Sequence, residues 1–311
     1  MQARKTRETT AQATLHLMVL AAALILVCGL TVASQLTLLR AMNSQGLSLV
    51  EIGGYARMRV LRFLKPFFET RSNMDHAFLI GVSESGDALL YSVQSGRGPY
   101  SRLAHDQIDI STVGGRAVTS IHLNVRGLTA LYAELSPDQR AIAVVGGLSG
   151  PADRMPVYGI HLFRLSGESK TLVATTEPEA PHSIGWSKDG NSIVYDTAER
   201  VWVYQLDTST SSFLADGDHP TWSPDGAWIA YRRIDGTAAL VSPDGSHSKR
   251  ILGGAKIRAG LRWSPDSRYL LFSDASGIKV LDLADDQIAV VFVPIDQYNE
   301  TRLRWVRDLP E

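Results

Sequence analysis

Short apolar stretches alternate with turn-forming residues along most of this chain. Residues 228–231 and 269–272 are rich in aliphatic and aromatic side chains, and a segment related to Ser-Pro-Asp-Gly precedes each of them. In such a segment proline presets the first corner of a tight turn, aspartate accepts hydrogen bonds from nearby amides, and glycine tolerates a positive φ. Apolar stretches bounded by these turns predict short β-strands that pair as hairpins.

The hairpins belong to an internal repeat, and each copy has an anchor residue directly before its turn. The fullest copy reads Trp-Ser-Pro-Asp-Gly and starts at Trp222, and a partial copy surrounds Trp305. The fixed step from each anchor to a later apolar residue predicts that the motif is a turn between two strands. This step is nine residues in the pairs Trp186 and Tyr195, Trp222 and Tyr231, Trp263 and Phe272, Leu135 and Val144, and Val82 and Tyr91.

The spacing of the repeats predicts the architecture. The motif aspartates are 51, 36, 41 and 42 residues apart, in the order Asp138, Asp189, Asp225, Asp266 and Asp308. A period of about 40 residues with four strands per repeat is typical of a β-propeller blade. We therefore expect an all-β fold, a β-propeller of four-stranded blades.

Six blades are favoured over five. Residues 72–311 contain five recognisable repeats, and the strand around Trp305 would be the inner strand of a sixth. Residues 47–70 could supply the outer strands of that blade, so that the two ends of the chain close the ring. Closure removes the exposed strand edges that an open sheet would present.

The Trp-Ser-Pro-Asp-Gly units, with an apolar or aromatic residue nine positions on, resemble the repeats of TolB-like, WD-repeat-like six-bladed β-propellers. Similar repeats occur in the propeller domains of prolyl oligopeptidase-like peptidases and in oligogalacturonate lyases. The resemblance covers about three quarters of the chain. It implies a fold but not a function, because this fold hosts binding modules and enzymes alike.

Residues 15–33 form an apolar run that is long enough to cross a bilayer. Basic residues precede it, which predicts that the N-terminus stays in the cytoplasm and that the propeller lies outside, in the periplasm or beyond the cell. A cleaved signal peptide is the alternative, with a poor cleavage site at residues 32–34. The expected organisation is a cytoplasmic tail, a transmembrane anchor in the inner membrane, a membrane-proximal linker and the propeller, at residues 1–14, 15–38, 39–71 and 72–311.

The composition limits the classes of partner that we expect this protein to bind. The chain has 44% apolar and 20% charged residues, and its formal net charge is −1. This balance gives no electrostatic case for nucleic acid. Cys28 is the only cysteine and lies in the apolar run, so we expect no disulfide in the propeller. Residues 57–65 could form a basic amphipathic helix on the membrane surface, or a stalk or strands packed onto the propeller.

The sequence contains no recognisable catalytic motif, so we do not expect an enzyme. A peptidase of the related type needs Gly-x-Ser-x-Gly and a hydrolase domain, and neither is found. Phosphate-binding loops and zinc-type cysteine and histidine sets are also missing from the sequence, so no cofactor is predicted. The repeated motif aspartates are expected to form turns, because one aspartate per turn supplies too few oxygens for calcium.

Three histidines offer a weak metal hypothesis. His76, His182 and His219 each precede an inner strand, so they would share one rim of the ring. Converging imidazoles and carboxylates there could bind a divalent metal, as the resemblance to oligogalacturonate lyases implies. Ordinary polar loop residues would give the same pattern. The neighbouring Asp75 and Asp218 are candidates for a binding surface.

Arginines gather near the last two inner strands, at Arg258, Arg262, Arg302 and Arg304. They could bind an anionic partner at the channel mouth, or they could be solvated. The sequence thus predicts a membrane-anchored, extracytoplasmic scaffold that binds an envelope protein. The alternatives are a metal-assisted, lyase-like carbohydrate-active propeller and a ligand-sensing domain.

Overall fold

The computed structural model describes most of the chain after residue 37. The described residues are 38–42, 44–51, 57–61, 68–72, 77–83, 88–94, 105–112, 117–122, 128–148, 157–174, 181, 183–197, 199–258, 260–292 and 303–307. Apart from a short helical segment at residues 38–42 and a few turns, these residues form β-strands. Among them, no helix is long and apolar enough to cross a membrane. The predicted anchor and tail lie almost entirely outside the described residues.

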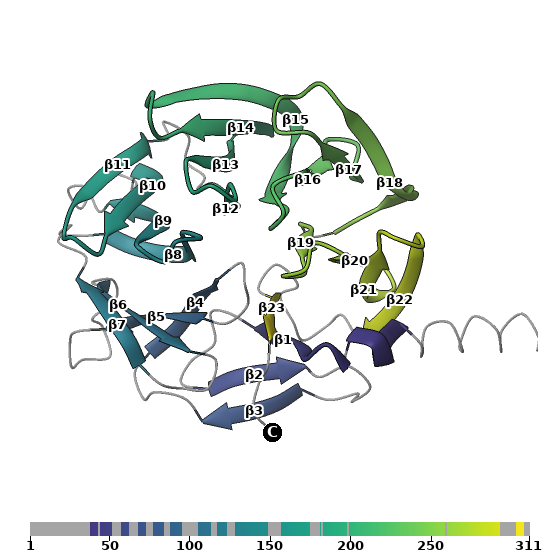
Figure 1. Ribbon diagram of the computed structural model, residues 1–311, viewed down its shortest axis with the longest axis horizontal. Helices are drawn as coiled ribbons and strands as arrows, with labels where there is room; N and C mark the ends of the chain where they lie inside the picture. The colour runs from purple at the N-terminus through teal and green to yellow at the C-terminus, as the bar shows by residue number, and fades with distance from the viewer. Residues whose placement is uncertain are drawn as a thin grey trace, which may run out of the picture.

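The described strands form four four-stranded sheets and one seven-stranded sheet, all antiparallel. Figure 1 shows them arranged around a central axis. We name the four-stranded groups units A to F. Unit A contains β4 (Ala77–Val82), β5 (Ala88–Gln94), β6 (His105–Thr112) and β7 (Ala117–His122). Unit B contains β8 (Leu128–Leu135), β9 (Ala141–Leu148), β10 (Val157–Arg164) and β11 (Ser169–Ala174).

The seven-stranded sheet consists of units C and D, which share one long strand. Unit C contains β12 (Ile184–Trp186), β13 (Ser192–Thr197), β14 (Arg200–Gln205) and the first part of β15 (Thr210–Trp222). Unit D contains the second part of β15, β16 (Ile229–Arg233), β17 (Thr237–Val241) and β18 (Ser248–Lys256). Unit E contains β19 (Arg262–Trp263), β20 (Tyr269–Asp274), β21 (Gly277–Asp282) and β22 (Gln287–Phe292).

Strand β15 changes partners at Gly217. It pairs with β14 up to Asp216 and with β16 from Gly217 onward. The change needs positive φ angles, of 154° at Gly217 and 51° at His219. A Cβ at residue 217 would lie 2.2 Å from the carbonyl oxygen of Arg232, so only glycine fits there. The outer strand of unit C thus runs directly into the inner strand of unit D.

Unit F joins the two ends of the described chain. It contains β23 (Leu303–Arg307), β1 (Leu47–Glu51), β2 (Arg57–Leu61) and β3 (Phe68–Ser72), in that order across the sheet. Leu49 pairs with Trp305 and Leu47 with Arg307. Three strands therefore come from the segment expected as a linker, and the pairing of both ends that the sequence predicted is present. The amphipathic helix considered for residues 57–65 is wrong for residues 57–61, which form β2.

The repeated motif is a turn, as predicted. Ser187 Oγ donates to Asp189 Oδ1 at 2.5 Å, and the same carboxylate oxygen accepts from the Asn191 amide at 3.0 Å. The Ser192 amide donates to Ser187 Oγ at 2.9 Å. The same three bonds recur in the turns at Ser136, Ser223, Ser242 and Ser264. The motif aspartates are therefore occupied by turn formation.

Three of the anchor tryptophans, Trp186, Trp263 and Trp305, connect neighbouring units. Trp186 Nε1 donates to the Glu134 carbonyl at 3.2 Å, which links unit C to unit B. Equivalent bonds run from Trp263 to the Thr221 carbonyl at 3.2 Å and from Trp305 to the Arg262 carbonyl at 3.1 Å. Apolar clusters fill the spaces between the sheets, with Trp186 between units B and C and Trp263 between units D and E. Packing between units therefore supplies the core.

Candidate binding site in the central channel

A small cavity lies on the axis where the inner strands converge. It has a volume of about 50 Å³. All six units contribute to its lining, through Ser83, Glu134, Gly185, Thr221, Arg262 and Trp305 among others. Several of these residues stand directly before the anchor of their repeat, because side chains alternate along a strand and the anchors point between units. The cavity has room for a few water molecules or for one small polar group.

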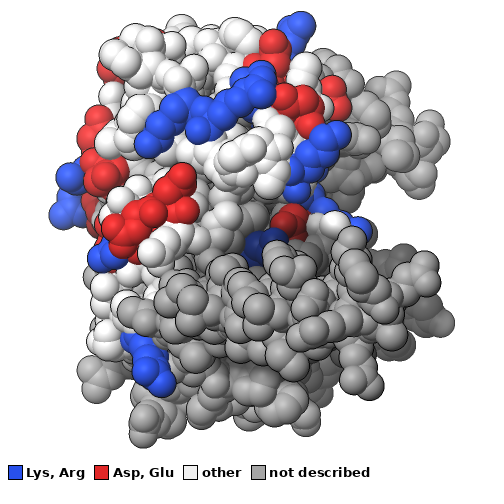
Figure 2. Space-filling view, turned by 90° about the vertical axis from the view of Figure 1, so that its right-hand side faces the viewer, with Lys and Arg blue, Asp and Glu red and all other residues white. Residues whose placement is uncertain are grey.

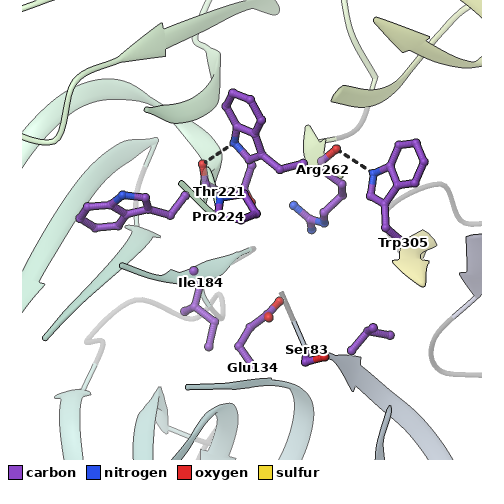
Figure 3. A pocket seen from close by; sticks show the side chains of 11 residues that line it. Ser83, Glu134, Ile184, Thr221, Pro224, Arg262 and Trp305 are labelled. Atoms are coloured by element: carbon purple, nitrogen blue, oxygen red, sulfur yellow. Dashed lines mark hydrogen bonds between the residues drawn. The ribbon is translucent and has the colours of Figure 1, made fainter. Parts of the chain in front are cut away.

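Arg262 and Glu134 give this cavity its charge. Their side chains extend into the cavity from different sides (Figure 3). Arg262 is 8% exposed, and its Nη1 donates to the Leu261 carbonyl at 2.9 Å and to Ser183 Oγ at 3.3 Å. The guanidinium is thus held in place by unit E and unit C together. Its planar set of donors suits a carboxylate or phosphate.

An ion pair braces the start of the unit D inner strand. Arg232 Nε donates to Asp218 Oδ1 at 2.7 Å, and Arg232 Nη2 donates to Asp218 Oδ2. Burial alone would raise the pKa of Asp218, but the hydrogen bonds and charges of Arg232 and His219 outweigh it and hold the pKa well below its usual range. The bond to Asp218 raises the pKa of Arg232. Arg232 Nη1 also donates to the Arg258 carbonyl at 3.1 Å.

A buried carboxylate ties units C and D together beside this pair. Asp196 is fully buried, and it accepts from the Ser183 amide at 3.0 Å and from the His219 amide at 3.1 Å. His219 is 8% exposed, and its Nδ1 lies 3.2 Å from Asp218 Oδ1. A Cβ at residue 260 would lie 2.5 Å from the His219 Cβ, so Gly260 is required for this contact. Arg232, Asp218, His219 and Asp196 thus form a packed, hydrogen-bonded network at the rim of the channel, which we call the rim network.

Comparison with solved structures agrees with the ring of sheets. The chain is similar to a solved structure described as a "putative TolB" from Agrobacterium tumefaciens, with a TM-score of 0.53 and 19% sequence identity over 79% of this chain and 88% of that chain. The chain has a TolB-like fold. No protein-family model matches it.

One curated relative matches in sequence. It is an uncharacterized protein of Agrobacterium fabrum, 28% identical over an alignment of 138 residues that covers 40% of this chain. The match spans 46% of that protein, so the chain covers about half of its length. The similarity to this relative indicates no activity, because the relative is itself described as uncharacterized.

The TolB-like ring places only some of the predicted site residues in the channel. Arg262 lines the cavity, whereas Arg258 is exposed at the rim and contributes its carbonyl group. Asp218 and His219 belong to the rim network. Asp75, His76, His182 and Arg302 lie outside the described residues, so the three-histidine metal hypothesis stays a prediction. The described part of the chain holds no group of three or more metal-ligating side chains.

Sequence reasoning missed Glu134 and Asp196. Glu134 stands directly before the anchor Leu135, in the position that Arg262 takes before Trp263. Side chains alternate along a strand, so a residue directly before an anchor points away from the space between units and toward the channel. Glu134 could have been found by this rule once the anchors were assigned to the spaces between units. Asp196 follows Tyr195 in β13, and its role depends on the amides of Ser183 and His219, which only the fold brings together.

A wider groove separates units C and D on the side of the repeated turns. Its volume is about 650 Å³, within the range of ordinary small-molecule sites. Polar lining comes from Lys188, Asp189 and Gln205, and Trp222 and Pro243 line it as well. The indole of Trp222 donates within its own unit, to the Gly226 carbonyl at 3.5 Å, whereas the other anchor tryptophans reach the preceding unit. The groove therefore lies at the junction of units C and D, where, among the described residues, the anchor tryptophan makes no hydrogen bond to the preceding unit.

Proposed function

We propose that units A to F are the six blades of a TolB-like propeller that binds another envelope protein at the mouth of its channel. In this proposal the apolar run at residues 15–33 anchors the chain in the inner membrane, and the propeller lies on the extracytoplasmic side; the anchor expected at residues 15–38 is shortened, because Leu38 is buried in the ring. It works as a scaffold, without catalysis, cofactor or nucleic acid.

The observation that carries the protein-binding proposal is the small charged cavity on the axis. With about 50 Å³ it is well below the 300–1,000 Å³ or so of typical small-molecule pockets. It also contains a buried arginine that two units hold in place. A site of this size suits the tip of a partner side chain or a terminal carboxylate, with most of the contact on the surrounding loops. Rigid scaffolds commonly present binding residues in this way.

Site-specific photo-crosslinking in native membranes tests this proposal. A photoreactive residue at Pro224, which lines the cavity, should give a discrete adduct with an envelope protein. The same residue at Leu165, on the perimeter of unit B, is the matched control. Arg262→Gln should reduce the Pro224 adduct at least about tenfold, since a charge-assisted hydrogen bond contributes about 1.5–3 kcal/mol. Equal adducts at both positions, or no effect of Arg262→Gln, would contradict the proposal.

The groove between units C and D favours small-molecule sensing as a second candidate. Its volume of about 650 Å³ and its mixed lining of carboxylates, an amide, a lysine and a tryptophan suit a polar metabolite. Screening a polar metabolite library by thermal shift would test it. A ligand whose stabilisation is lost in Gln205→Ala supports sensing, and a library without such a ligand leaves protein binding as the function.

A further inference from the structure

The helical segment at residues 38–42 is locked into the ring rather than free. Leu38, Leu39 and Met42 are 6%, 9% and 0% exposed. They pack in one cluster with residues from unit E, including Tyr269 and Val280, and with Trp305 of unit F. In Figure 1 this segment lies at the perimeter of the ring, beside β22. Their apolar side chains are therefore committed to the propeller and cannot contribute to a membrane span.

Very little chain connects this segment to the apolar run. Only Ser34, Gln35, Leu36 and Thr37 separate Ala33, the last residue of the run, from Leu38. Even fully extended, the five Cα–Cα steps from Ala33 to Leu38 reach at most about 18 Å. A headgroup layer occupies about 5–7 Å of that distance. Whatever the path of these residues, unit E must lie close to the membrane surface if the run spans the bilayer.

Unit D, which follows unit E around the ring on the side away from the segment, and unit E itself carry perimeter groups that suit a lipid surface. Strand β18 of unit D presents exposed Lys249, Arg250 and Lys256. Ile288 of unit E is 39% exposed. Figure 2 shows this side of the molecule, where Lys and Arg side chains are interspersed with Asp and Glu across the described part. Opposing charges are present in Asp285 and Asp286, which are exposed in the turn before β22, and in Asp235, which pairs with Arg250 at 3.5 Å.

We propose that the propeller stands on its edge, with the perimeter of units D and E against the headgroups of an anionic lipid surface. The cations of β18 contact lipid phosphates there, and the four-residue tether keeps the edge in place. The ring axis then runs roughly parallel to the membrane, so both channel mouths open sideways to partners. This inference rests on the membrane anchor of the proposed function.

Fluorescence quenching of the full chain in lipid nanodiscs tests the orientation. In a Cys28→Ser background, a fluorophore is placed at Ile288→Cys of unit E or at Leu165→Cys of unit B, on the far side of the ring. Spin-labelled headgroups should quench the unit E label several-fold more strongly than the unit B label. Equal quenching of both labels in membrane-inserted protein overturns the edge-on orientation and leaves the anchor intact.

A second arm tests the lipid charge. The triple variant Lys249→Glu, Arg250→Glu and Lys256→Glu should lose most of the extra quenching at Ile288→Cys that phosphatidylglycerol gives over phosphatidylcholine. An unchanged response to lipid charge overturns the headgroup contact of β18. If the chain does not insert, and its mass in native membranes shows that residues 1–33 are gone, the anchor itself fails and the orientation falls with it.

Discussion

Trp263 and Trp222 occupy the same position of the repeat but donate to different acceptors. Trp263 Nε1 bonds the neighbouring unit at 3.2 Å, whereas Trp222 Nε1 makes a long bond of 3.5 Å within its own unit. We expect Trp263→Phe to lower the free energy of unfolding by about 1 kcal/mol more than Trp222→Phe, because only the first variant leaves a well-placed carbonyl without its donor. Urea unfolding measures both. Equal losses would show that the bond between units contributes nothing of its own.

The depressed pKa of Asp218 predicts acid sensitivity. A carboxylate whose folded pKa lies below its unfolded value stabilises the fold above about pH 4, and this contribution is lost as the pH falls through the folded pKa. Asp218→Asn should therefore cost about 2 kcal/mol at neutral pH, since it removes charge-assisted bonds from Arg232. The gap between the wild type and the variant should be constant above about pH 5 and shrink below about pH 4. If the stability difference stayed constant down to pH 2, the loss in Asp218→Asn would come from the altered shape of the side chain and not from its charge.

At the scale of the elements, the joint in β15 is a position that tolerates little change. Gly217→Ala would place a Cβ 2.2 Å from the Arg232 carbonyl oxygen, so the backbone of two strands must shift. We expect a loss of about 3 kcal/mol or more, as for other strained or overpacked sites. Gly167→Ala is the matched control, because Gly167 also has a positive φ, of 92°, but has open space around it. The control should cost about 1 kcal/mol. Thermal and urea unfolding of the two variants give the comparison.

Elements with strong local signals could be predicted from the sequence. The Ser-Pro-Asp-Gly turns are encoded within five residues, so the hairpins and the strands that flank them follow from local chemistry. The continuity of β15 could not be predicted, because Gly217 and Pro220 indicate breaks and the pairing with two sheets decides otherwise. Among the described residues that line the cavity, only Arg262 was predicted as a binding residue, whereas the predicted Asp218 and Arg258 lie at the rim. The burial of Asp218 and His219 depends on Arg232 in β16, Asp196 in β13 and Gly260 before β19, which come together only in the folded ring.

At the scale of the whole molecule, stability depends on closure by the last strand. Strand β23 lines one edge of β1, and Trp305 packs with the helical segment and unit E. Removing residues 303–311 should expose β1, break the bond from Trp305 to unit E, and lower the melting temperature by about 10 °C or more, because a buried tryptophan and a strand pairing are lost together. Differential scanning calorimetry of the truncated and full chains checks this. Removing only residues 308–311 is the control and should leave the melting temperature nearly unchanged.

The pairing of β1 with β23 also sets the order in which the molecule can be completed during synthesis. Leu47 and Arg307 are partners although 260 positions separate them. Strand β1 is translated before units A to E and then waits for a neighbour that is translated after them, while units A to E can already assemble. Throughout that interval the nascent chain has an unpaired β1 edge and an open gap in its ring. An unpaired edge invites association with other chains. We therefore expect chaperone protection of β1 and its neighbours to raise the yield of folded protein.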